Sequence, residues 1–297
     1  MEFKSGFVAV VGMPNVGKST LVNALLKKKV SIVTPKPQTT RNKIMAVLNT
    51  PNRQIIFVDT PGIHKANNNL DKFMDKSINS ATEDVDLILL MVDGTKVLYD
   101  QVKLLDKKYK SSDIPKFLVI NKIDVADKAK IALEIDKIKD EINVKEIVFI
   151  SAKTRKNFDI LLNLIDPYLT DNIHYFDENS YTDKSQKFLI SEIIREKALY
   201  LIQEEIPHGI GIAVDSLERK DNLTTINATI YCEKPSHKAI IIGKNGSMLK
   251  DIGKRAREEM EKIFKTKIYL DLWVKVKENW KNLPSVLTHI GYNDDNL

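Results

Sequence analysis

Eight residues near the N-terminus have the types and the spacing that bind phosphate. Residues 12–19 read Gly-Met-Pro-Asn-Val-Gly-Lys-Ser, which matches G-x-x-x-x-G-K-[ST] between an apolar run and an amphipathic stretch. Glycines allow backbone N–H groups to close around phosphate oxygens, and a following helix adds the positive end of its dipole. In this pattern Lys18 reaches the β- and γ-phosphates and the Ser19 hydroxyl binds Mg²⁺. A chance glycine-rich turn is the alternative, which the strand–loop–helix setting disfavours.

Three later segments place polar residues directly after apolar runs. They read Asp-Thr-Pro-Gly at residues 59–62, Asn-Lys-Ile-Asp at 121–124 and Ser-Ala-Lys at 151–153. Asp59 can hold Mg²⁺ through water, and the Gly62 amide can sense a γ-phosphate. Each segment alone could be an ordinary polar turn, but four in this order indicate one nucleotide site. The residues expected to contact the nucleotide are Gly12, Met13, Pro14, Asn15, Val16, Gly17, Lys18, Ser19, Thr20, Asp59, Thr60, Pro61, Gly62, Asn121, Lys122, Asp124, Ser151, Ala152 and Lys153.

The third segment predicts which base the site selects. Asp124 can accept hydrogen bonds from N1–H and the exocyclic amine of guanine, whereas adenine lacks both donors on that edge. Adenine would leave the carboxylate desolvated and unpaired, at a cost of about 1–3 kcal/mol or more. We expect Asn121 to brace the loop and approach the base, the Lys122 stem to lie over the purine ring, and the Ala152 amide to meet the guanine oxygen. The sequence therefore predicts GTP and GDP as ligands.

A polar loop at residues 34–41 lies between the first two motifs. A threonine there could complete Mg²⁺ coordination when the γ-phosphate is present, and we expect Thr40 in preference to Thr39. This loop and residues 64–69 are natural order–disorder switches, although both could simply be mobile surface loops. The expected Mg²⁺ ligands are Ser19, Thr40 and Asp59, and the expected catalytic residues are Lys18, Thr40 and Gly62.

The first half of the chain alternates short apolar runs with amphipathic stretches. The runs are continuous, which is typical of strands buried on both faces of a mostly parallel sheet. This pattern predicts a doubly wound α/β domain that binds ligands at the carboxyl ends of its strands, where the motifs lie. The expected strands are residues 7–11, 55–58, 87–92, 117–120 and 147–150, and the expected helices are residues 19–26, 70–82, 101–109, 128–142 and 158–169.

The order of elements changes after a polar, turn-rich stretch at residues 166–183. It becomes α-β-β-α-α-β, with helices at residues 185–204, 236–242 and 247–264 and strands at 211–217, 224–232 and 267–275. We expect Cys232 to be an inert strand residue and Trp273 to pack in the final strand, while Trp280 has no predicted place. The predicted organisation is a first domain at 1–170, a linker at 171–184, a second α+β domain at 185–280 and a tail at 281–297.

A second glycine loop, Gly-Lys-Asn-Gly at residues 243–246, joins the two later helices of this second domain. In the α-β-β-α-α-β order this is the type II KH arrangement, whose G-x-x-G loop clamps a single-stranded nucleic-acid backbone. A helix cap followed by a turn is the plainer interpretation, and basic side chains on the next helix could simply face water. The residues expected to bind RNA are Ile242, Gly243, Lys244, Asn245, Gly246, Lys250, Lys254 and Arg255.

The motifs resemble those of the Era family of bacterial ribosome-assembly GTPases along nearly the whole chain. Besides the phosphate-binding loop and Asp-Thr-Pro-Gly, the similar segments are Gln-Thr-Thr-Arg at residues 38–41, Ser-Glu-Ile-Ile-Arg-Glu-Lys at 191–197 and Leu-Trp-Val-Lys-Val-Lys at 272–277. The resemblance implies a P-loop GTPase domain followed by a type II KH domain that binds single-stranded RNA near the 3′ end of small-subunit (16S) ribosomal RNA. It also implies a role in 30S ribosomal subunit assembly and rRNA maturation, with the GTP state controlling how both domains engage RNA.

Two residues bear on the mechanism that this resemblance implies. Ras-like enzymes orient the attacking water with a Gln after the glycine of the second motif, but Ile63 stands here and cannot hydrogen-bond to water. We therefore expect slow intrinsic turnover. Asn15 matches a position that helps bind a monovalent cation such as K⁺ in related GTPases, and it is equally well interpreted as a loop-bracing amide. Two other functions stay open: an RNA-binding module that GTP orders with negligible hydrolysis, and a membrane-associated cell-cycle regulatory GTPase.

The composition excludes several classes of protein. The chain has 297 residues, 46 Lys and Arg against 40 Asp and Glu, and one Cys. A single Cys excludes an intramolecular disulfide and Cys-rich metal sites. No apolar run approaches the roughly 18 residues of a membrane helix, and no targeting signal is evident. We expect a cytoplasmic monomer, with peripheral contact at the inner face of the cell membrane as an alternative.

Replacement of Asp124 by Asn tests the assignment of the base. We expect Asp124→Asn to shift the preference of the site from guanine to xanthine nucleotides, because the amide donates where the carboxylate accepts. Competition binding with GDP and xanthosine diphosphate measures this shift, and an unchanged preference for guanine would contradict the assignment.

Overall fold

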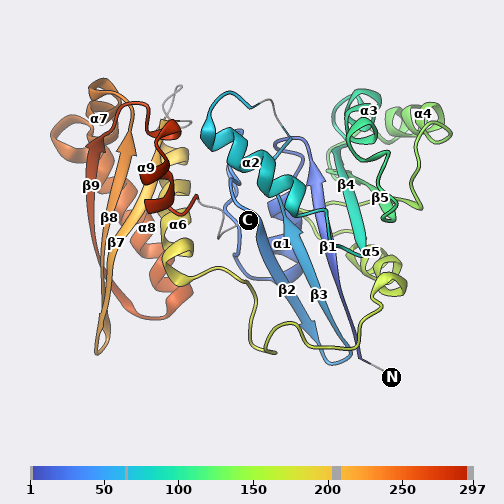
Figure 1. The fold of residues 1–297 in the computed structure, drawn as a ribbon, viewed down its shortest axis with the longest axis horizontal. Helices are drawn as coiled ribbons and strands as arrows, with labels where there is room; N and C mark the ends of the chain where they lie inside the picture. Colours follow the sequence, from blue (N-terminus) through green and yellow to red (C-terminus); the bar gives the residue numbers. More distant parts are fainter. Residues whose placement is uncertain (1–2, 64–65, 203–208, 293–297) are drawn as a thin grey trace.

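The computed structural model describes residues 3–63, 66–202 and 209–292 of the chain. The chain forms two β-sheets, each with its own helices, that lie side by side (Figure 1). No helix among the residues so described is long and apolar enough to cross a membrane.

The first sheet has six strands in the order β2-β3-β1-β4-β5-β6. Strands β2 and β3 are antiparallel, and the other neighbouring strands are parallel. All five strands predicted from apolar runs are present, each with bounds that differ by a few residues at most. The strands are β1 (Lys4–Gly12), β2 (Ile44–Thr50), β3 (Arg53–Asp59), β4 (Leu87–Asp93), β5 (Lys116–Asn121) and β6 (Glu146–Phe149).

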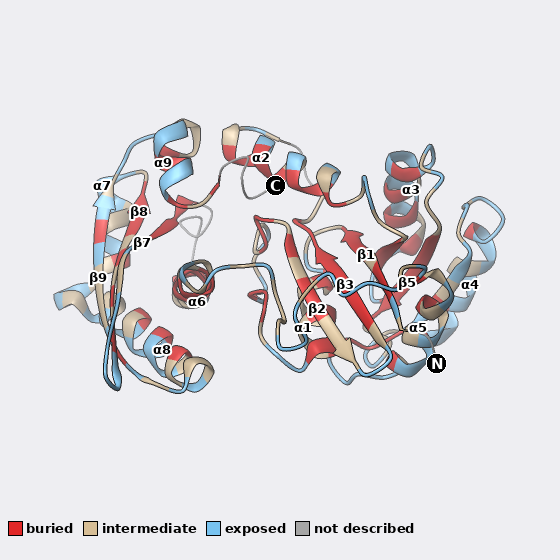
Figure 2. Ribbon diagram, turned by 60° about the horizontal axis from the view of Figure 1, so that its bottom comes forward, coloured by how far each residue is buried: buried red, intermediate tan, exposed pale blue. Residues whose placement is uncertain are grey.

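Helices cover both faces of this sheet, which confirms the doubly wound α/β prediction. Alternate residues of β1 enter different cores: Val8 and Val10 pack with α1 and α5, whereas Ala9 and Val11 pack with α3 and α4. The central strands are therefore buried on both sides (Figure 2). The helices are α1 (Lys18–Leu26), α2 (Asn69–Ser80), α3 (Leu98–Tyr109), α4 (Lys128–Ile138) and α5 (Phe158–Ile165).

Several helix ends differ from the sequence-based expectation. Helix α3 begins at Leu98 rather than at residue 101, and α4 ends at Ile138 rather than at residue 142. Helix α5 ends at Ile165 and continues as the short 3₁₀ helix η1 (Asp166–Tyr168). Pro167 lacks an N–H group to continue an α-helix, which accounts for the change.

The segment predicted as a linker contacts β1 and β3 near their first residues and then the edge strand β2. The side chain of Gln54 in β3 accepts hydrogen bonds from the backbone N–H groups of Tyr175 and Phe176 and donates to the Phe176 carbonyl. Isolated bridges join Ser5 to Asp171 and Ala46 to Thr182. The segment is thus fixed to the first sheet before it reaches the second.

The second sheet has three strands in the order β7-β8-β9, with β7–β8 antiparallel and β8–β9 parallel. The α-β-β-α-α-β order is as predicted. Helices α6 and α8 pack on one face of the sheet, and α6 lies between this sheet and the first domain (Figures 1 and 2). The predicted end of the first helix, at residues 203–204, lies outside the described residues. The elements are α6 (Gln186–Leu201), β7 (Gly211–Lys220), β8 (Leu223–Cys232), α7 (Pro235–Ile242), α8 (Ser247–Phe264) and β9 (Lys267–Val276).

Trp273 differs from its prediction, and Trp280 has a place that the sequence did not predict. Trp273 was expected to pack in the final strand, but its side chain is 64% exposed and donates to Asp271 Oδ2 at 2.9 Å. Its neighbour Val274 faces the helices, so Trp273 must face the opposite side of the sheet. Trp280, which the sequence could not place, is fully buried and donates to the Gly209 carbonyl.

The residues predicted as a tail include ordered structure that joins the two domains. They form part of the 3₁₀ helix η4 (Trp280–Asn282) and all of α9 (Pro284–His289). Trp280 and residues of α9 share an apolar cluster with Leu70, Phe73 and Met74 of α2. The C-terminal segment therefore fills the space between α2 and the second sheet.

Candidate functional site

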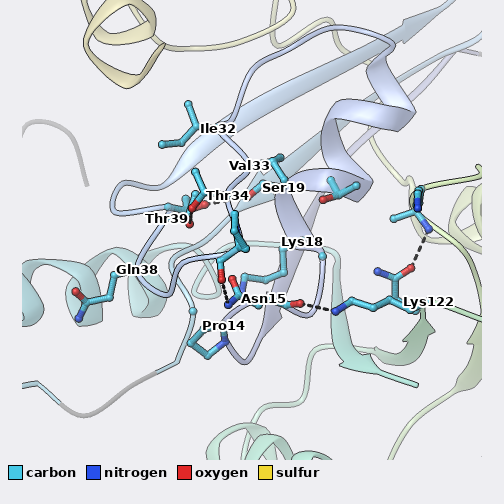
Figure 3. Close-up of a pocket in the computed structure, with 18 of the residues that line it drawn as sticks. Pro14, Asn15, Lys18, Ser19, Ile32, Val33, Thr34, Gln38, Thr39 and Lys122 are labelled. Atoms are coloured by element: carbon cyan, nitrogen blue, oxygen red, sulfur yellow. Dashed lines mark hydrogen bonds between the residues drawn. The ribbon is translucent and has the colours of Figure 1, made fainter. Parts of the chain in front are cut away.

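A cavity of about 500 Å³ lies at the carboxyl ends of the first sheet's parallel strands. Residues from all four predicted motifs line it, and Figure 3 shows several lining side chains around Lys18 and Ser19. Twelve of the predicted nucleotide-contacting residues are among the lining residues: Pro14, Asn15, Gly17, Lys18, Ser19, Thr20, Gly62, Asn121, Lys122, Asp124, Ala152 and Lys153.

The other predicted residues support the cavity from behind. Val16 belongs to the apolar core, Thr60 donates from its hydroxyl to the Val10 carbonyl, and Ser151 contacts Asp124. The carbonyls of Gly12 and Met13 accept hydrogen bonds from Lys18. Those that do not line the cavity are Gly12, Met13, Val16, Asp59, Thr60, Pro61 and Ser151.

Lys18 is a buried cation at the floor of this cavity. Its Nζ donates to the carbonyls of Gly12 and Met13, each at 3.1 Å. Burial lowers the pKa of Lys18 to about 8, and the charge of Asp59 only partly offsets this. A polyanion in the cavity would stabilise the ammonium, as the pattern of the phosphate-binding loop requires.

Asp59 is a buried carboxylate near the hydroxyl groups of Ser19 and Ser31. Neither of its oxygens has a hydrogen-bond partner among the described residues. Burial raises the pKa of Asp59, while the nearby Ser19 hydroxyl and Lys18 ammonium oppose the rise. Ser19 Oγ lies 2.8 Å from Thr40 Oγ1. These are the three side chains expected to bind Mg²⁺, and a buried carboxylate without a partner fits a cation.

The base end of the cavity is built from the third and fourth motifs. Asn121 Nδ2 donates to the Val16 carbonyl, and Asn121 Oδ1 accepts from the Ala152 N–H, both at 2.8 Å. Ser151 Oγ donates to Asp124 Oδ1 at 2.7 Å, which orients that carboxylate. The Ala152 N–H therefore already has a partner in Asn121, and its contact with a guanine oxygen stays a prediction.

Lys122 links the base end of the cavity to the phosphate-binding loop. Its Nζ donates to the Asn15 carbonyl at 2.9 Å (Figure 3) and to Asp93 Oδ2 at 2.6 Å. Burial alone would raise the pKa of Asp93, but Lys122 and Thr95 outweigh it and lower the pKa. The Asn15 amide donates to the Pro35 carbonyl at 2.9 Å, so it braces the loop against its neighbour.

Two glycines of the motifs permit approaches that a side chain would block. Gly17 has a φ of +105°, and a Cβ there would lie 2.3 Å from Asn121 Nδ2. A Cβ on Gly62 would lie within 3 Å of three atoms of Pro14. Close packing of the first, second and third motifs therefore depends on these positions.

The cavity also contains residues that the sequence analysis did not assign. Ile32, Val33 and Gln38 line it from the loop before β2, and Tyr200 lines it from α6. Tyr200 is 63% exposed. Its helix was predicted, but the helical pattern carries no signal that this residue approaches a cavity in the other domain.

The second glycine loop links α7 to α8, as predicted, through the 3₁₀ helix η3 (Lys244–Gly246). Three of its four residues have positive φ: Gly243, Asn245 and Gly246. A Cβ on Gly243 would lie 2.7 Å from Met248 Cβ, whereas one on Gly246 would meet nothing within 4 Å. The backbone at Gly246 is therefore open to a ligand.

Exposed basic residues lie in this loop and along the helix that follows it. Lys244, Lys250, Lys254 and Arg255 are exposed, and none of them forms an ion pair with any described part of the chain. Arg255 lies further away, beside Lys197 and Tyr200 of α6. Ile242 is half-buried against the core of the second domain. Lys250 and Lys254 follow the loop along α8, whereas Arg255 lies toward α6, and the role of all these residues in RNA binding stays a prediction.

Comparison with known proteins identifies both domains. Residues 7–122 match the family described as "50S ribosome-binding GTPase", and residues 205–281 match the KH domain family. The chain is 46% identical over 295 residues to GTPase Era of Clostridioides difficile, covering 98% of this chain and 99% of that one. It is 45% identical over 297 residues to GTPase Era of Caldanaerobacter subterraneus, covering 99% and 100%.

Solved structures agree over the same length. Era in complex with MgGDPNP and nucleotides 1506–1542 of 16S ribosomal RNA superposes with a TM-score of 0.93 at 40% identity, covering 98% of this chain and 99% of that one. A variant of Aquifex aeolicus Era bound to GDP·AlF₄⁻ gives the same values. The fold is therefore a P-loop GTPase domain followed by a KH domain, and the chain belongs to the Era family of GTPases.

Proposed function

We propose that this GTPase binds GTP and GDP with Mg²⁺ in the cavity of its first domain and binds single-stranded 16S ribosomal RNA at its second glycine loop. We further propose that it acts in 30S subunit assembly and rRNA maturation. The observation that carries the proposal is the presence, in one chain, of a phosphate-binding cavity and an open, basic glycine loop. The related Era complex, which holds a GTP analogue and a 16S fragment, supports the same combination.

Magnesium fits the donor set on the floor of the cavity. The partnerless carboxylate of Asp59 lies near the Ser19 hydroxyl, which itself contacts Thr40. Bound Mg²⁺ would neutralise charge that develops on the phosphates. Lys18 would exchange its two carbonyl partners for phosphate oxygens, which would keep the ammonium charged.

Slow intrinsic hydrolysis is expected from the residue after Gly62. Ile63 packs against the core cluster of α3 and α4, and its N–H donates to the Gly12 carbonyl. This side chain cannot orient an attacking water, so backbone groups or a partner must do so. Single-turnover hydrolysis of GTP separates a slow enzyme from a module that only uses GTP to order its loops.

Binding of RNA is supported by the shape and charge of the second glycine loop. The open backbone at Gly246 allows a phosphate to approach, and the Lys244 side chain beside it is exposed. Half-buried Ile242 and Met248 and the 41% exposed Ile240 offer apolar surface to unstacked bases. Binding of RNA at this surface should weaken as salt concentration rises.

The affinity for GDP should depend on the protonation of Lys18. Below pH 8 the ammonium is already protonated before nucleotide arrives, so affinity should be constant there. Above pH 8 Lys18 must take up a proton to face the phosphates, and affinity should fall by up to about tenfold per pH unit. Calorimetry in buffers of different ionisation enthalpy should detect proton uptake at pH 9 and little at pH 7.

Lys18→Arg provides the control for this pH dependence, because arginine stays protonated throughout the range. A loss of affinity at high pH that wild type and Lys18→Arg share is caused by deprotonation of guanine N1–H, and not by deprotonation of Lys18. If wild type and Lys18→Arg lose affinity equally, Lys18 is not the group that takes up the proton.

Substitution of Gly246 tests the RNA site in the full-length protein. Gly246→Asp should abolish crosslinking to 16S ribosomal RNA and leave basal GTP hydrolysis intact, because it puts a negative charge where phosphate would approach. Gly246→Ala carries the same backbone strain at a φ of +77° without the charge, so it should bind RNA better than Gly246→Asp. Loss of both activities in Gly246→Asp would identify the loop as a structural turn.

We also propose that a monovalent cation binds beside the phosphates at Asn15. The Asn15 side chain donates through Nδ2 to the Pro35 carbonyl. The other polar atom of this side chain, Oδ1, accepts no hydrogen bond from the residues that the structure describes. GTP hydrolysis should be faster in K⁺ than in Na⁺ at equal ionic strength, and Asn15→Ala should remove the difference. Equal rates in the two salts would contradict the proposal.

A further inference from the structure

Helix α6 of the second domain contacts the loop that carries Thr40. Arg195 of this helix is 1% exposed, and its guanidinium is held by Glu192 through Nε–Oε1 at 2.7 Å and Nη2–Oε2 at 2.5 Å. The same Nη2 donates to the backbone carbonyl of Thr39 in the first domain. The next residue, Glu196, accepts a hydrogen bond at Oε1 from the Val33 N–H at 3.1 Å.

The contact with Thr39 fixes the peptide bond that joins Thr39 to Thr40. Because a peptide unit is planar, holding its carbonyl also sets the direction of the Thr40 N–H and limits the orientation of Thr40. Thr40 Oγ1 then lies 2.8 Å from Ser19 Oγ. The loop before it is held by its own contacts: the Thr39 hydroxyl donates to the Lys36 carbonyl and lies 2.7 Å from Thr34 Oγ1 (Figure 3).

The burial of Arg195 is not explained by stability alone. Its Nη1 is buried without a partner among the described residues. A buried guanidinium–carboxylate pair with an unsatisfied donor is often no more stable than an apolar pair of similar volume. What an apolar side chain could not supply at this position is the hydrogen bond to the Thr39 carbonyl.

We propose that Arg195 is a positioning residue for GTP hydrolysis: through the Thr39 carbonyl it holds Thr40 at the Mg²⁺ site. The second domain thus completes the nucleotide site of the first. This inference rests on the proposed role of Thr40 and Ser19 as Mg²⁺ ligands.

The test compares three variants of the full-length protein. Glu192→Gln keeps the donor to Thr39, whereas Glu192→Gln/Arg195→Met removes the donor and leaves no buried charge unpaired. Ser191→Ala is the control in the same helix, because the Ser191 hydroxyl donates to the Phe188 carbonyl within α6 and has no hydrogen-bond partner in the described part of the first domain. Single-turnover GTP hydrolysis, Mg²⁺ titrations with GTP and GDP, and thermal unfolding are measured for each.

We expect the double variant to hydrolyse GTP about 10- to 100-fold more slowly than Glu192→Gln, as misplacement of a catalytic group does. It should also need more Mg²⁺ for hydrolysis while its affinity for Mg²⁺·GDP stays within twofold, because Thr40 meets the metal only with the γ-phosphate present. Wild-type rates in the double variant, or an equal loss of GDP and GTP binding together with a lower melting temperature, would overturn the proposal.

Thr40→Ala separates this inference from the proposed function. If Thr40 is a ligand, Thr40→Ala alone should slow hydrolysis, and adding the double substitution should slow it little further, because both changes remove the same interaction. Normal hydrolysis in Thr40→Ala would refute the assignment of Thr40 itself. Slow hydrolysis in Thr40→Ala with full activity in the Glu192→Gln/Arg195→Met variant would refute only the role of Arg195.

Discussion

The loop between α1 and β2 is held from both domains, and this constraint links the nucleotide site to the second sheet. Backbone groups of this loop that are shielded from water must find partners within the protein. Here α6 supplies them through Arg195 and Glu196. At the end of the loop the buried guanidinium of Arg41 donates to the Ile210 carbonyl at 2.8 Å and to the Tyr292 hydroxyl at 3.3 Å. The loop, the residues that lead into β7 and the C-terminal segment therefore cannot move independently without leaving buried donors unpaired, and each unsatisfied buried donor typically costs about 1–3 kcal/mol.

The floor of the nucleotide cavity combines two charges that burial disfavours. The pKa of Lys18 is lowered and that of Asp59 is raised, in both cases chiefly by desolvation. Their mutual attraction only partly compensates for the lost hydration. A magnesium nucleotide brings phosphates to the ammonium and a cation to the carboxylate, so the penalty falls when the ligand binds. These two buried charges are consistent with a site whose remaining charged partners come from solution. Bound ligand should therefore stabilise the fold by an amount that grows with the logarithm of its concentration relative to Kd.

The sequence predicted those parts of the protein whose signal is local. Continuous apolar runs predict strands of a sheet that is buried on both faces. Each motif directly follows one of these strands, so its position in the fold could be predicted.

Contacts between distant segments gave no such signal. Trp280 needs α2 as a partner, and Arg195 needs a loop more than 150 residues earlier. The exposure of Trp273 could have been derived from strand alternation once Val274 was assigned to the core. The hydrogen bond between the Ala152 N–H and Asn121 could not have been derived in this way. A motif shows which groups can contact a ligand, but it does not show which of them already bind another side chain.

The distribution of charge shows the same dependence on the fold. Residues 171–297 contain 19 basic and 20 acidic residues, which argues against a polyanionic partner if they are taken together. Within this half, residues 234–281 carry 13 basic and 6 acidic residues. The fold then sequesters some of the acidic groups: Glu259 pairs with Lys29 and Lys197, which lower its pKa although burial alone would raise it, and Glu261 accepts from the Ile268 N–H. The basic side chains near the second glycine loop keep no such partners among the described residues. The electrostatic potential at a surface depends on the charges that remain unpaired there. The positive potential at this loop therefore depends on which carboxylates are already paired elsewhere in the fold.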